Sequence, residues 1–337
     1  MTARTGWGVL GCARIATDEI LPAIGDLPEA RLHAVASRDP DRARAVATRF
    51  GATRHYGKYG DLVADPDVDA VYIPLPNHLH AKWATEALRA GKAVLVEKPG
   101  ALSLTEARQL VACARDRNLV IGEASMFRFR RQWAFLERWL SDNLAPGESA
   151  LTRVHVGYDI TTRTAPGEFR LEQRIGGGAL LDVGTYAITA ASALFGRAKS
   201  ATLTQFQHSS GPVDGISVGS LAFEANRVLA FTCDFHNAWV DTPLEVRTRL
   251  ATVRLDHAFN PGLHPSEAHI LRQGHAPDIR KFDGENAYAT MLAEFSRNMP
   301  AGSGSTFAQR QAENLLTSAH NLSLLVAHNT SAAATES

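Results

Sequence analysis

The sequence predicts an α/β fold in two parts, a doubly wound parallel sheet followed by an α/β domain with a large, open, mostly antiparallel sheet. Two observations indicate this. Up to about residue 125, short apolar runs alternate with amphipathic helical segments, which is the pattern of βα units in a parallel sheet. From residue 126 the alternation is lost, and strand-like segments follow one another after one long helical segment, which favours antiparallel pairing.

A chain of 337 residues is too long for one ordinary core and suits two domains. We expect a first domain over residues 1–125, a second over 126–330 and a flexible tail over 331–337. The C-terminal helix is a candidate to pack back on the first domain. The expected strands of the second domain are 152–159, 201–207, 216–224, 228–234, 244–248 and 252–255, and its last helices are expected over 287–298 and 306–328.

Composition limits the classes of partner and compartment. Lys plus Arg and Asp plus Glu both number 35, so the formal net charge is zero and nothing draws the chain as a whole to nucleic acid or to an anionic membrane. No stretch reaches the roughly 18 apolar residues of a membrane span. The three cysteines show no disulfide or zinc spacing, which favours a reducing cytoplasm.

The N-terminal strand, residues 7–10, leads into a small-residue turn and then a helix that reaches about Leu27. Strand, turn and helix in this order are the context of a dinucleotide fingerprint, although the spacing here is G-x-A-x-x-A, with Ala13 in place of the middle glycine. On its own the match is weak, because any βα turn that starts with glycine resembles it. The expected cofactor contacts in this turn are Gly11, Cys12, Ala13, Arg14 and Ile15.

The second strand ends at Ser37, where a domain that binds NAD usually has an acidic residue for the ribose 2′-hydroxyl. Arg38 follows, and Arg42 lies one helical turn further on. A hydroxyl with two guanidinium groups suits a 2′-phosphate, so the sequence favours NADP(H) over NAD(H). Two alternatives stay open: Asp39 could face the ribose if the register slips, and Arg42 could lie on a solvated helix face.

Residues 93–96 are four small or branched apolar residues, as in a central strand covered on both faces, and Glu97, Lys98 and Pro99 follow directly. Ligands of an open α/β sheet bind outside the carboxyl ends of its strands. Glu97 and Lys98 therefore stand where chemistry is expected. The alternative, for a generic Glu-Lys pair, is a solvated strand end.

A triple glycine, residues 176–178, opens a helical segment that carries Asp182 and Tyr186, four residues apart and hence on one face. An ammonium near the phenol of Tyr186 would favour the phenolate, and such a tyrosine can exchange a proton with a carbonyl or an alcohol while hydride moves. We expect Lys98 to supply that ammonium. On helical spacing alone, a core tyrosine with a satisfied hydroxyl is the stronger alternative.

The sequence resembles the Gfo/Idh/MocA oxidoreductases over nearly the whole chain. Four segments carry the resemblance: the N-terminal turn, residues 74–80, the Glu97-Lys98-Pro99 segment and residues 176–186. The resemblance implies a Rossmann domain, then a domain whose open sheet commonly forms a homodimer or homotetramer interface. It also implies an enzyme that transfers hydride between a nicotinamide cofactor and a sugar, polyol or related carbonyl. The family's lysine carries over to Lys98, and its aspartate to Asp182.

Tyr186 stands where many members have histidine, which is similar to a subgroup of dihydrodiol dehydrogenases, NADP-dependent xylose dehydrogenases, aldose oxidoreductases and nucleotide-sugar 3-ketoreductases. This resemblance implies NADP(H) and a small sugar-like substrate, with Tyr186 as general acid or base, Lys98 assisting it and Asp182 positioning the substrate hydroxyl. The expected cleft contacts are Arg128, Phe169 and Arg170. The expected cofactor contacts beyond the first turn are Ser37, Arg38, Arg42, Pro74, Leu75, Asn77, His80, Glu97 and Lys98.

Some roles and rival functions stay open. Asn77 could instead cap a helix, and Glu97 could order either the nicotinamide ribose or Lys98. Some relatives of the family are glycosidases that use the redox cofactor, and this chain keeps the residues which that reaction needs. An NADP-binding sensor without catalysis is the other rival, although it would not need Lys98 and Tyr186. We expect no metal, because none of the 13 histidines lies in a metal-binding motif.

Overall fold

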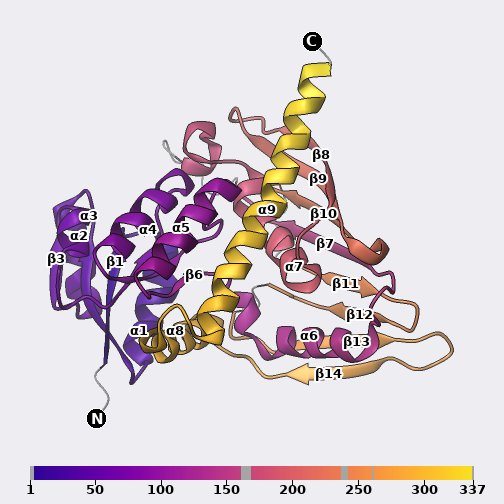
Figure 1. The fold of residues 1–337 in the computed structure, drawn as a ribbon, viewed down its shortest axis with the longest axis horizontal. Coiled ribbons are helices and arrows are strands. Elements are labelled where there is room, and N and C mark those ends of the chain that lie inside the picture. The colour runs from indigo at the N-terminus through magenta and orange to yellow at the C-terminus, as the bar shows by residue number, and fades with distance from the viewer. Residues whose placement is uncertain (1–3, 161–167, 237–241, 260–261, 336–337) are drawn as a thin grey trace. The chain divides into compact units, whose positions relative to one another are not determined.

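The computed structural model describes residues 4–160, 168–236, 242–259 and 262–335. The chain divides into two compact units. Unit 1 consists of Met1–Ala124 and Asn286–Leu316, and unit 2 consists of Ser125–Glu285 and Thr317–Ser337. Each unit is built around one sheet of its own (Figure 1).

Unit 1 contains a six-stranded parallel sheet in the order β3-β2-β1-β4-β5-β6, which confirms the doubly wound prediction. The strands are β1 (Thr5–Leu10), β2 (Ala30–Ala36), β3 (Arg54–Tyr56), β4 (Ala70–Ile73), β5 (Ala93–Val96) and β6 (Ile121–Glu123). The chain moves outward in one direction from β1 to β3 and in the other from β4 to β6. The carboxyl ends of β1 and β4 therefore form the switch point at which such sheets bind ligands.

The helices between these strands begin and end where local chemistry dictates. They are α1 (Leu21–Asp26), which continues a π-helical turn over Ala16–Ile20, α2 (Pro40–Phe50), α3 (Tyr59–Val63), α4 (His80–Arg89) and α5 (Leu104–Asp116). The Ser103 hydroxyl caps α5 by accepting from the Glu106 N–H at 3.2 Å, and the Glu106 carboxylate accepts in return from Leu102 N–H at 2.9 Å. Gly51, at φ 69°, ends α2 in the left-handed conformation that glycine adopts most easily.

Residues 286–316, which the sequence analysis assigns to the second domain, group with unit 1. Helix α8 (Ala287–Asn298) packs beside α1 (Figure 1). The indole of Trp7 in β1 donates to Ser296 Oγ at 3.1 Å, and its ring lies 5.6 Å from that of Phe295. An apolar helix face fits either domain equally well, so sequence alone does not reveal this placement.

The last helix, α9 (Thr306–Thr335), begins in unit 1 and continues in unit 2. It extends beyond the expected end at residue 328, so residues 331–335, part of the expected tail, continue this helix. The final two residues, 336–337, lie outside the described part of the chain.

Unit 2 contains an eight-stranded sheet in the order β14-β13-β12-β11-β7-β10-β9-β8. Its strands are β7 (Leu151–Gly157), β8 (Ser200–Gln207), β9 (Asp214–Ala222), β10 (Val228–Asp234), β11 (Leu244–Arg247), β12 (Thr252–Leu255), β13 (Ser266–Leu271) and β14 (Asp278–Phe282). Only β7 and β10 pair in parallel among these strands, which confirms a mostly antiparallel sheet. Strands β13 and β14 are not among the expected strands, because their polar residues hide the strand pattern.

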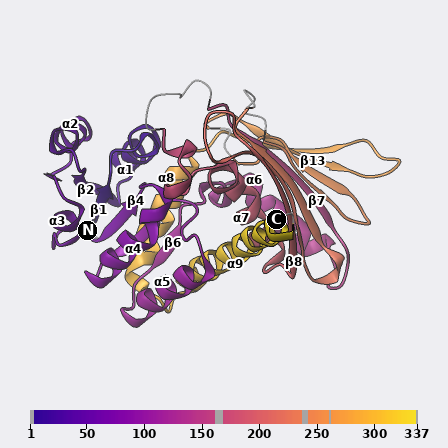
Figure 2. The same ribbon diagram turned by 90° about the horizontal axis from the view of Figure 1, so that it is seen from above.

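Helices α6 (Arg131–Asn143) and α7 (Thr185–Phe195) lie on one face of this sheet (Figure 2). Within the described residues, no helix or strand covers the opposite face. The strands follow this arrangement, because buried side chains alternate with more accessible ones along β7 and β9, and β8 is mostly accessible apart from the buried Leu203. The uncovered side is called the outer face below.

Among the described residues, one helical stretch, Gln173–Phe195, is long and apolar enough by composition to cross a membrane. About three fifths (61%) of its most apolar window is buried inside the protein. Core helices of soluble proteins pass the same test, so the stretch is weak evidence for a membrane.

Candidate functional site

The turn after β1 has the shape that a dinucleotide fingerprint requires. Gly11 has a φ of 107°, and a Cβ atom at this position would lie 3.1 Å from the Leu75 side chain. Glycine is therefore favoured both by its conformation and by its neighbour. Ala13 O accepts the N–H groups of Ala16 and Thr17, so the helix starts directly after the turn. Cys12 is buried, Ala13 and Ile15 are half-buried, and Arg14 is exposed.

The end of β2 gathers the residues expected at a 2′-phosphate. Ser37 is buried and its Oγ accepts from the Asp39 N–H at 3.2 Å, while Arg38 is exposed. Arg42 is exposed on α2, as in the alternative of a solvated helix face, and its Nη2 donates to Cys12 O at 2.7 Å, which ties α2 to the turn after β1. Burial raises the pKa of the Tyr59 phenol, and the neighbouring Arg38 guanidinium partly offsets this.

Asp39 acts as the N-cap of α2. Its Oδ1 accepts from the N–H groups of Asp41 and Arg42 at 3.0 and 3.1 Å. A carboxylate in this position stabilises the helix start through both hydrogen bonds and the helix dipole. In the alternative in which Asp39 binds the ribose, its carboxylate would have to give up these capping hydrogen bonds or share them with the ribose hydroxyl.

Glu97 follows β5 and turns toward its own neighbours. The Tyr72 hydroxyl in β4 donates to Glu97 Oε1 at 2.5 Å, and Glu97 Oε2 accepts from the Lys98 N–H at 3.3 Å. Burial raises the pKa of Glu97, against the hydrogen bond from Tyr72 and the charge of Lys98. Of its two expected roles, these contacts match the ordering of the Lys98 segment.

His80, at the start of α4, links the loops that follow β4 and β5. Its ring is buried, with Nδ1 2.8 Å from Pro99 O and Nε2 2.6 Å from Leu75 O. Burial lowers the pKa of His80, although both carbonyl contacts favour a protonated ring. Both ring nitrogens thus face the backbone, whereas a direct contact with a cofactor ribose is the role expected from the sequence.

Two further expected residues lie in the loop after β4. Pro74 is buried, and Asn77 begins a short 3₁₀ turn over Asn77–Leu79. Leu79 occupies the N-cap position of α4, and α4 has no side-chain cap. Asn77 therefore lies two residues before the N-cap position of α4.

In unit 2, Asp182 and Tyr186 stand on consecutive helical segments. Asp182 lies in a π-helical turn, Leu180–Gly184, and Tyr186 lies in the first turn of α7. The Leu180 N–H donates to Asp214 Oδ2 at 2.7 Å, so a strand residue caps the turn. The Tyr186 ring packs near Phe127 and Phe259, with centroid distances of 6.1 and 5.4 Å.

The structure also brings Asp182 together with Arg170 and Phe169. Arg170 Nε donates to Asp182 Oδ2 at 2.6 Å, and its guanidinium lies over the Phe169 ring at 4.4 Å. Arg128, the third expected cleft residue, forms an ion pair with Glu137 of α6 at 3.7 Å. Sequence reasoning missed Asp214, which no motif marks, and Glu168, whose only signal is its place two residues before Arg170.

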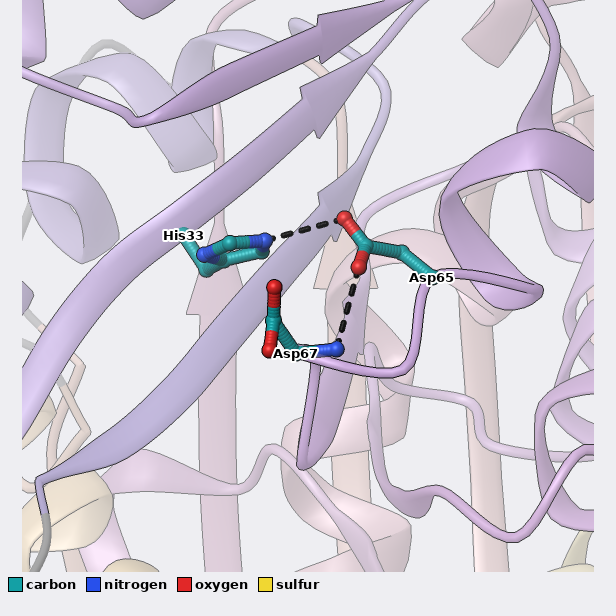
Figure 3. A group of neighbouring side chains, drawn as sticks. All are labelled: His33, Asp65 and Asp67. Atoms are coloured by element: carbon teal, nitrogen blue, oxygen red, sulfur yellow. Dashed lines mark hydrogen bonds and ion pairs between the residues drawn. The ribbon is translucent and has the colours of Figure 1, made fainter.

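A second polar cluster in unit 1 consists of His33, Asp65 and Asp67 (Figure 3). Arg31 Nη1 lies 2.6 Å from His33 Nδ1, and because guanidinium only donates, the ring proton belongs on Nε2, which donates to Asp65 at 2.9 Å. Burial raises the pKa of Asp65, but hydrogen bonds from the Asp67 N–H, Tyr56 and His33 outweigh it and lower the pKa overall. Both imidazole nitrogens are thus engaged, and the cluster is a structural network to which we assign no metal.

These features define a class. A parallel sheet with a glycine turn at its switch point and basic residues after β2 is typical of dinucleotide-binding domains, and unit 2 adds a carboxylate and a tyrosine on a helix. The chain belongs to the Gfo/Idh/MocA oxidoreductase family. Residues 5–125 match the oxidoreductase family model with an NAD-binding Rossmann fold, and residues 117–254 match the Gfo/Idh/MocA C-terminal domain.

Three relatives illustrate the likeness. The chain is 35% identical over 297 residues to a dTDP-3,4-didehydro-2,6-dideoxy-α-D-glucose 3-reductase of Actinomadura kijaniata, covering 88% of this chain and 87% of that protein. The alignment with an uncharacterized oxidoreductase of Rhizobium meliloti, 43% identical over 189 residues, spans about half of each protein, 56% and 55%. The crystal structure of KijD10, a 3-ketoreductase of A. kijaniata in complex with NADP and TDP-benzene, superimposes with a TM-score of 0.84 at 29% identity, covering 96% of this chain and 98% of that one.

Proposed function

We propose that this protein is an NADP(H)-dependent oxidoreductase that transfers hydride between nicotinamide and a sugar or sugar-like carbonyl or alcohol. The observation that carries the proposal is the alignment over nearly nine tenths of the chain with a reductase of a dTDP-linked keto sugar. The structural likeness to an NADP-bound 3-ketoreductase supports the same class of reaction and the same cofactor.

The residues at the switch point of unit 1 fit this cofactor. The turn at Gly11 has a positive φ, and a Cβ there would crowd the Leu75 side chain, so glycine suits this turn and the close approach of a pyrophosphate. Ser37, Arg38 and Arg42 would hold the 2′-phosphate, because a hydroxyl and guanidinium groups are the donors that phosphate oxygens accept best. The carboxylate that would favour NAD(H), Asp39, is already the cap of α2. When bound, NADP(H) supplies or accepts the hydride.

The chain's own residues supply the proton transfer and the orientation. Tyr186 gives a proton to the carbonyl oxygen of the substrate, or takes one from the alcohol in the reverse direction, as general acid or base. Lys98 assists by favouring the phenolate through its charge. Asp182 accepts a hydrogen bond from a substrate hydroxyl and so fixes the reacting carbon. Tyr72 and Glu97 hold the backbone that carries Lys98.

The same proposal covers the partners of the protein. A small, hydroxyl-rich molecule is the substrate, and neither nucleic acid nor a membrane is a partner, in keeping with a formal net charge of zero. The proposed location is the cytoplasm. The outer face of the unit 2 sheet joins copies of the chain into a homodimer or homotetramer. Exposed apolar side chains on that face, including Phe206 and Val218, support this assignment.

An activity screen tests the proposal. Purified protein is assayed with NADPH and, separately, NADH against aldoses, keto sugars and dTDP-linked sugars, with NADP⁺ for the reverse direction and product analysis by mass spectrometry. We expect a single redox product and a clear preference for NADPH. Glycoside cleavage without net consumption of cofactor would support the glycosidase of the same family instead. Tight NADPH binding without turnover of any substrate would support a sensor.

A further inference from the structure

We propose that Arg170 is a positioning residue, which orients the Asp182 carboxylate for a substrate hydroxyl and does not itself bind an anionic group of the substrate. The proposal rests on the proposed function, in which Asp182 contacts the substrate. It changes the role expected from the sequence, where Arg170 is a contact in the cleft. The arrangement of donors around its guanidinium, the backbone contacts of its loop and the local charge all lead to it.

The in-plane donors of Arg170 point at two carboxylates. Nε donates to Asp182 Oδ2 at 2.6 Å, and Nη1 donates to Glu168 Oε1 at 2.9 Å. All three side chains are largely buried, with at most 19% of each exposed, so water screens these pairs poorly. Burial alone lowers the pKa of Arg170, but the two carboxylates outweigh it and raise the pKa, so the guanidinium stays charged.

Aromatic rings lie against the guanidinium as well. The carbon of the guanidinium is 4.4 Å from the Phe169 ring centre and 5.8 Å from that of Tyr158. Stacking on aromatic faces leaves the edge donors of arginine free for carboxylates and restricts the plane in which they lie. The rings therefore help to fix the direction from which Arg170 reaches Asp182.

The backbone joins the same two segments. Arg170 O accepts from the Gly178 N–H at 2.8 Å, and Gly178 O accepts from the Asp182 N–H at 3.1 Å. A Cβ atom at Gly177 would lie 2.5 Å from Arg170 O, so the close approach requires glycine there. Arg170 thus contacts the turn that carries Asp182 both through its side chain and through its main chain.

Charge argues against the alternative role as an anion site. The carboxylates of Glu168 and Asp182 both contact the guanidinium of Arg170, so these three side chains together carry one net negative charge. A phosphate of the substrate would have to displace Asp182 or Glu168 from Arg170 and then lie beside the displaced carboxylate. Like charges at such distances repel each other strongly in a partly buried site.

The test uses the full-length protein and three variants. Arg170→Met removes the hydrogen-bond donors, and Arg170→Lys keeps the charge but not the planar set of guanidinium donors. The control is Arg174→Met, which removes an exposed arginine four residues further along the same segment. For each variant, kcat and KM are measured with NADPH and the best substrate of the screen. NADPH affinity is measured by nicotinamide fluorescence, and dTDP affinity by calorimetry.

We expect Arg170→Met to lower kcat/KM by about 10²-fold, as for a misplaced positioning group, with NADPH affinity unchanged. Arg170→Lys should recover part of the loss, and Arg174→Met should match the wild type. Neither Arg170 variant should weaken dTDP binding. Wild-type kcat/KM in Arg170→Met, or a loss of dTDP affinity as large as the loss of kcat/KM, would overturn the proposal.

A crystal structure of Arg170→Met gives a readout that does not need turnover. A shifted or disordered Asp182 side chain on an otherwise unchanged turn supports the positioning role, whereas an unmoved Asp182 refutes it. If Arg170→Met fails to fold, Glu168→Gln and Arg170→Lys provide the same comparison. If the wild type reduces nothing with NADPH, the proposed function fails, and the position of Asp182 still decides the role of Arg170.

Discussion

At the scale of single residues, Glu97 is a half-buried carboxyl group next to the proposed catalytic lysine. Taking a carboxylate out of water disfavours its charged form, and this outweighs the hydrogen bond from Tyr72, so the pKa of Glu97 is raised above its usual 4.5. Between that value and the raised pKa, the folded protein holds a proton that the unfolded chain has released. The free energy of unfolding therefore falls as the pH rises through this window, and the effect is complete above it.

Glu97→Gln should remove this dependence, because glutamine keeps an acceptor for the Tyr72 hydroxyl but does not ionise. The stability of the variant relative to the wild type should therefore increase from about pH 4.5 upward and then level off. Urea unfolding at a series of pH values measures it. Glu86→Gln, which removes a half-exposed carboxylate of α4, is the control. Parallel curves for Glu97→Gln and wild type would contradict the buried-acid account.

At the scale of elements, the helices and strands that could be predicted are those whose ends are marked by residues close by in the sequence. The span 40–50 of α2 follows from Asp39, Pro40 and Gly51, and the structure has the helix at those residues. Strand β14 could not be found, because its side chains are mostly exposed and carry no alternation of burial. The π-helical turn at Asp182 could not be found either, since it depends on Asp214, a residue 32 positions further along the chain.

The outer face of the unit 2 sheet carries a prediction at this scale. Val218 pairs with Thr204 on one side and Thr232 on the other, and it is 42% exposed at the middle of β9, the second strand from one edge of the sheet. An uncovered sheet face with apolar residues gains free energy by packing on a second copy. The exposed large apolar side chains of β7, β8 and β9 are Leu151, Phe206 and Val218.

Val218→Lys should place a charge in the proposed interface between the outer faces of two copies and so convert the oligomer into monomers, as measured by light scattering after gel filtration. Leu263→Lys changes an exposed leucine outside the strands and should leave the mass unaltered. An oligomer of wild-type mass in Val218→Lys, or a wild-type protein that is already monomeric, would remove the outer face from the assembly.

At the scale of the whole molecule, the motifs locate the proposed site to different degrees in the two units. In unit 1, Gly11, Ser37 and Lys98 follow strands whose order is predictable, so the sequence indicates that they lie at one edge of the sheet. In unit 2, the contact of Arg170 with Asp182 and Glu168 depends on how a loop folds against a glycine turn, which no periodicity encodes. The sequence identifies Asp182, Tyr186 and Arg170 but not the contact between Arg170 and Asp182.

Tyr186→Phe tests the central claim most directly, because it removes only the hydroxyl that the proposed reaction needs. Turnover with NADPH and the best substrate should fall by roughly 10²–10⁴-fold, the range for lost general acid–base catalysis, while NADPH affinity by nicotinamide fluorescence stays at the wild-type value. Tyr56→Phe, which removes a hydroxyl from the Asp65 network, controls for loss of a tyrosine hydroxyl elsewhere. Turnover of Tyr186→Phe at the wild-type rate would contradict the account.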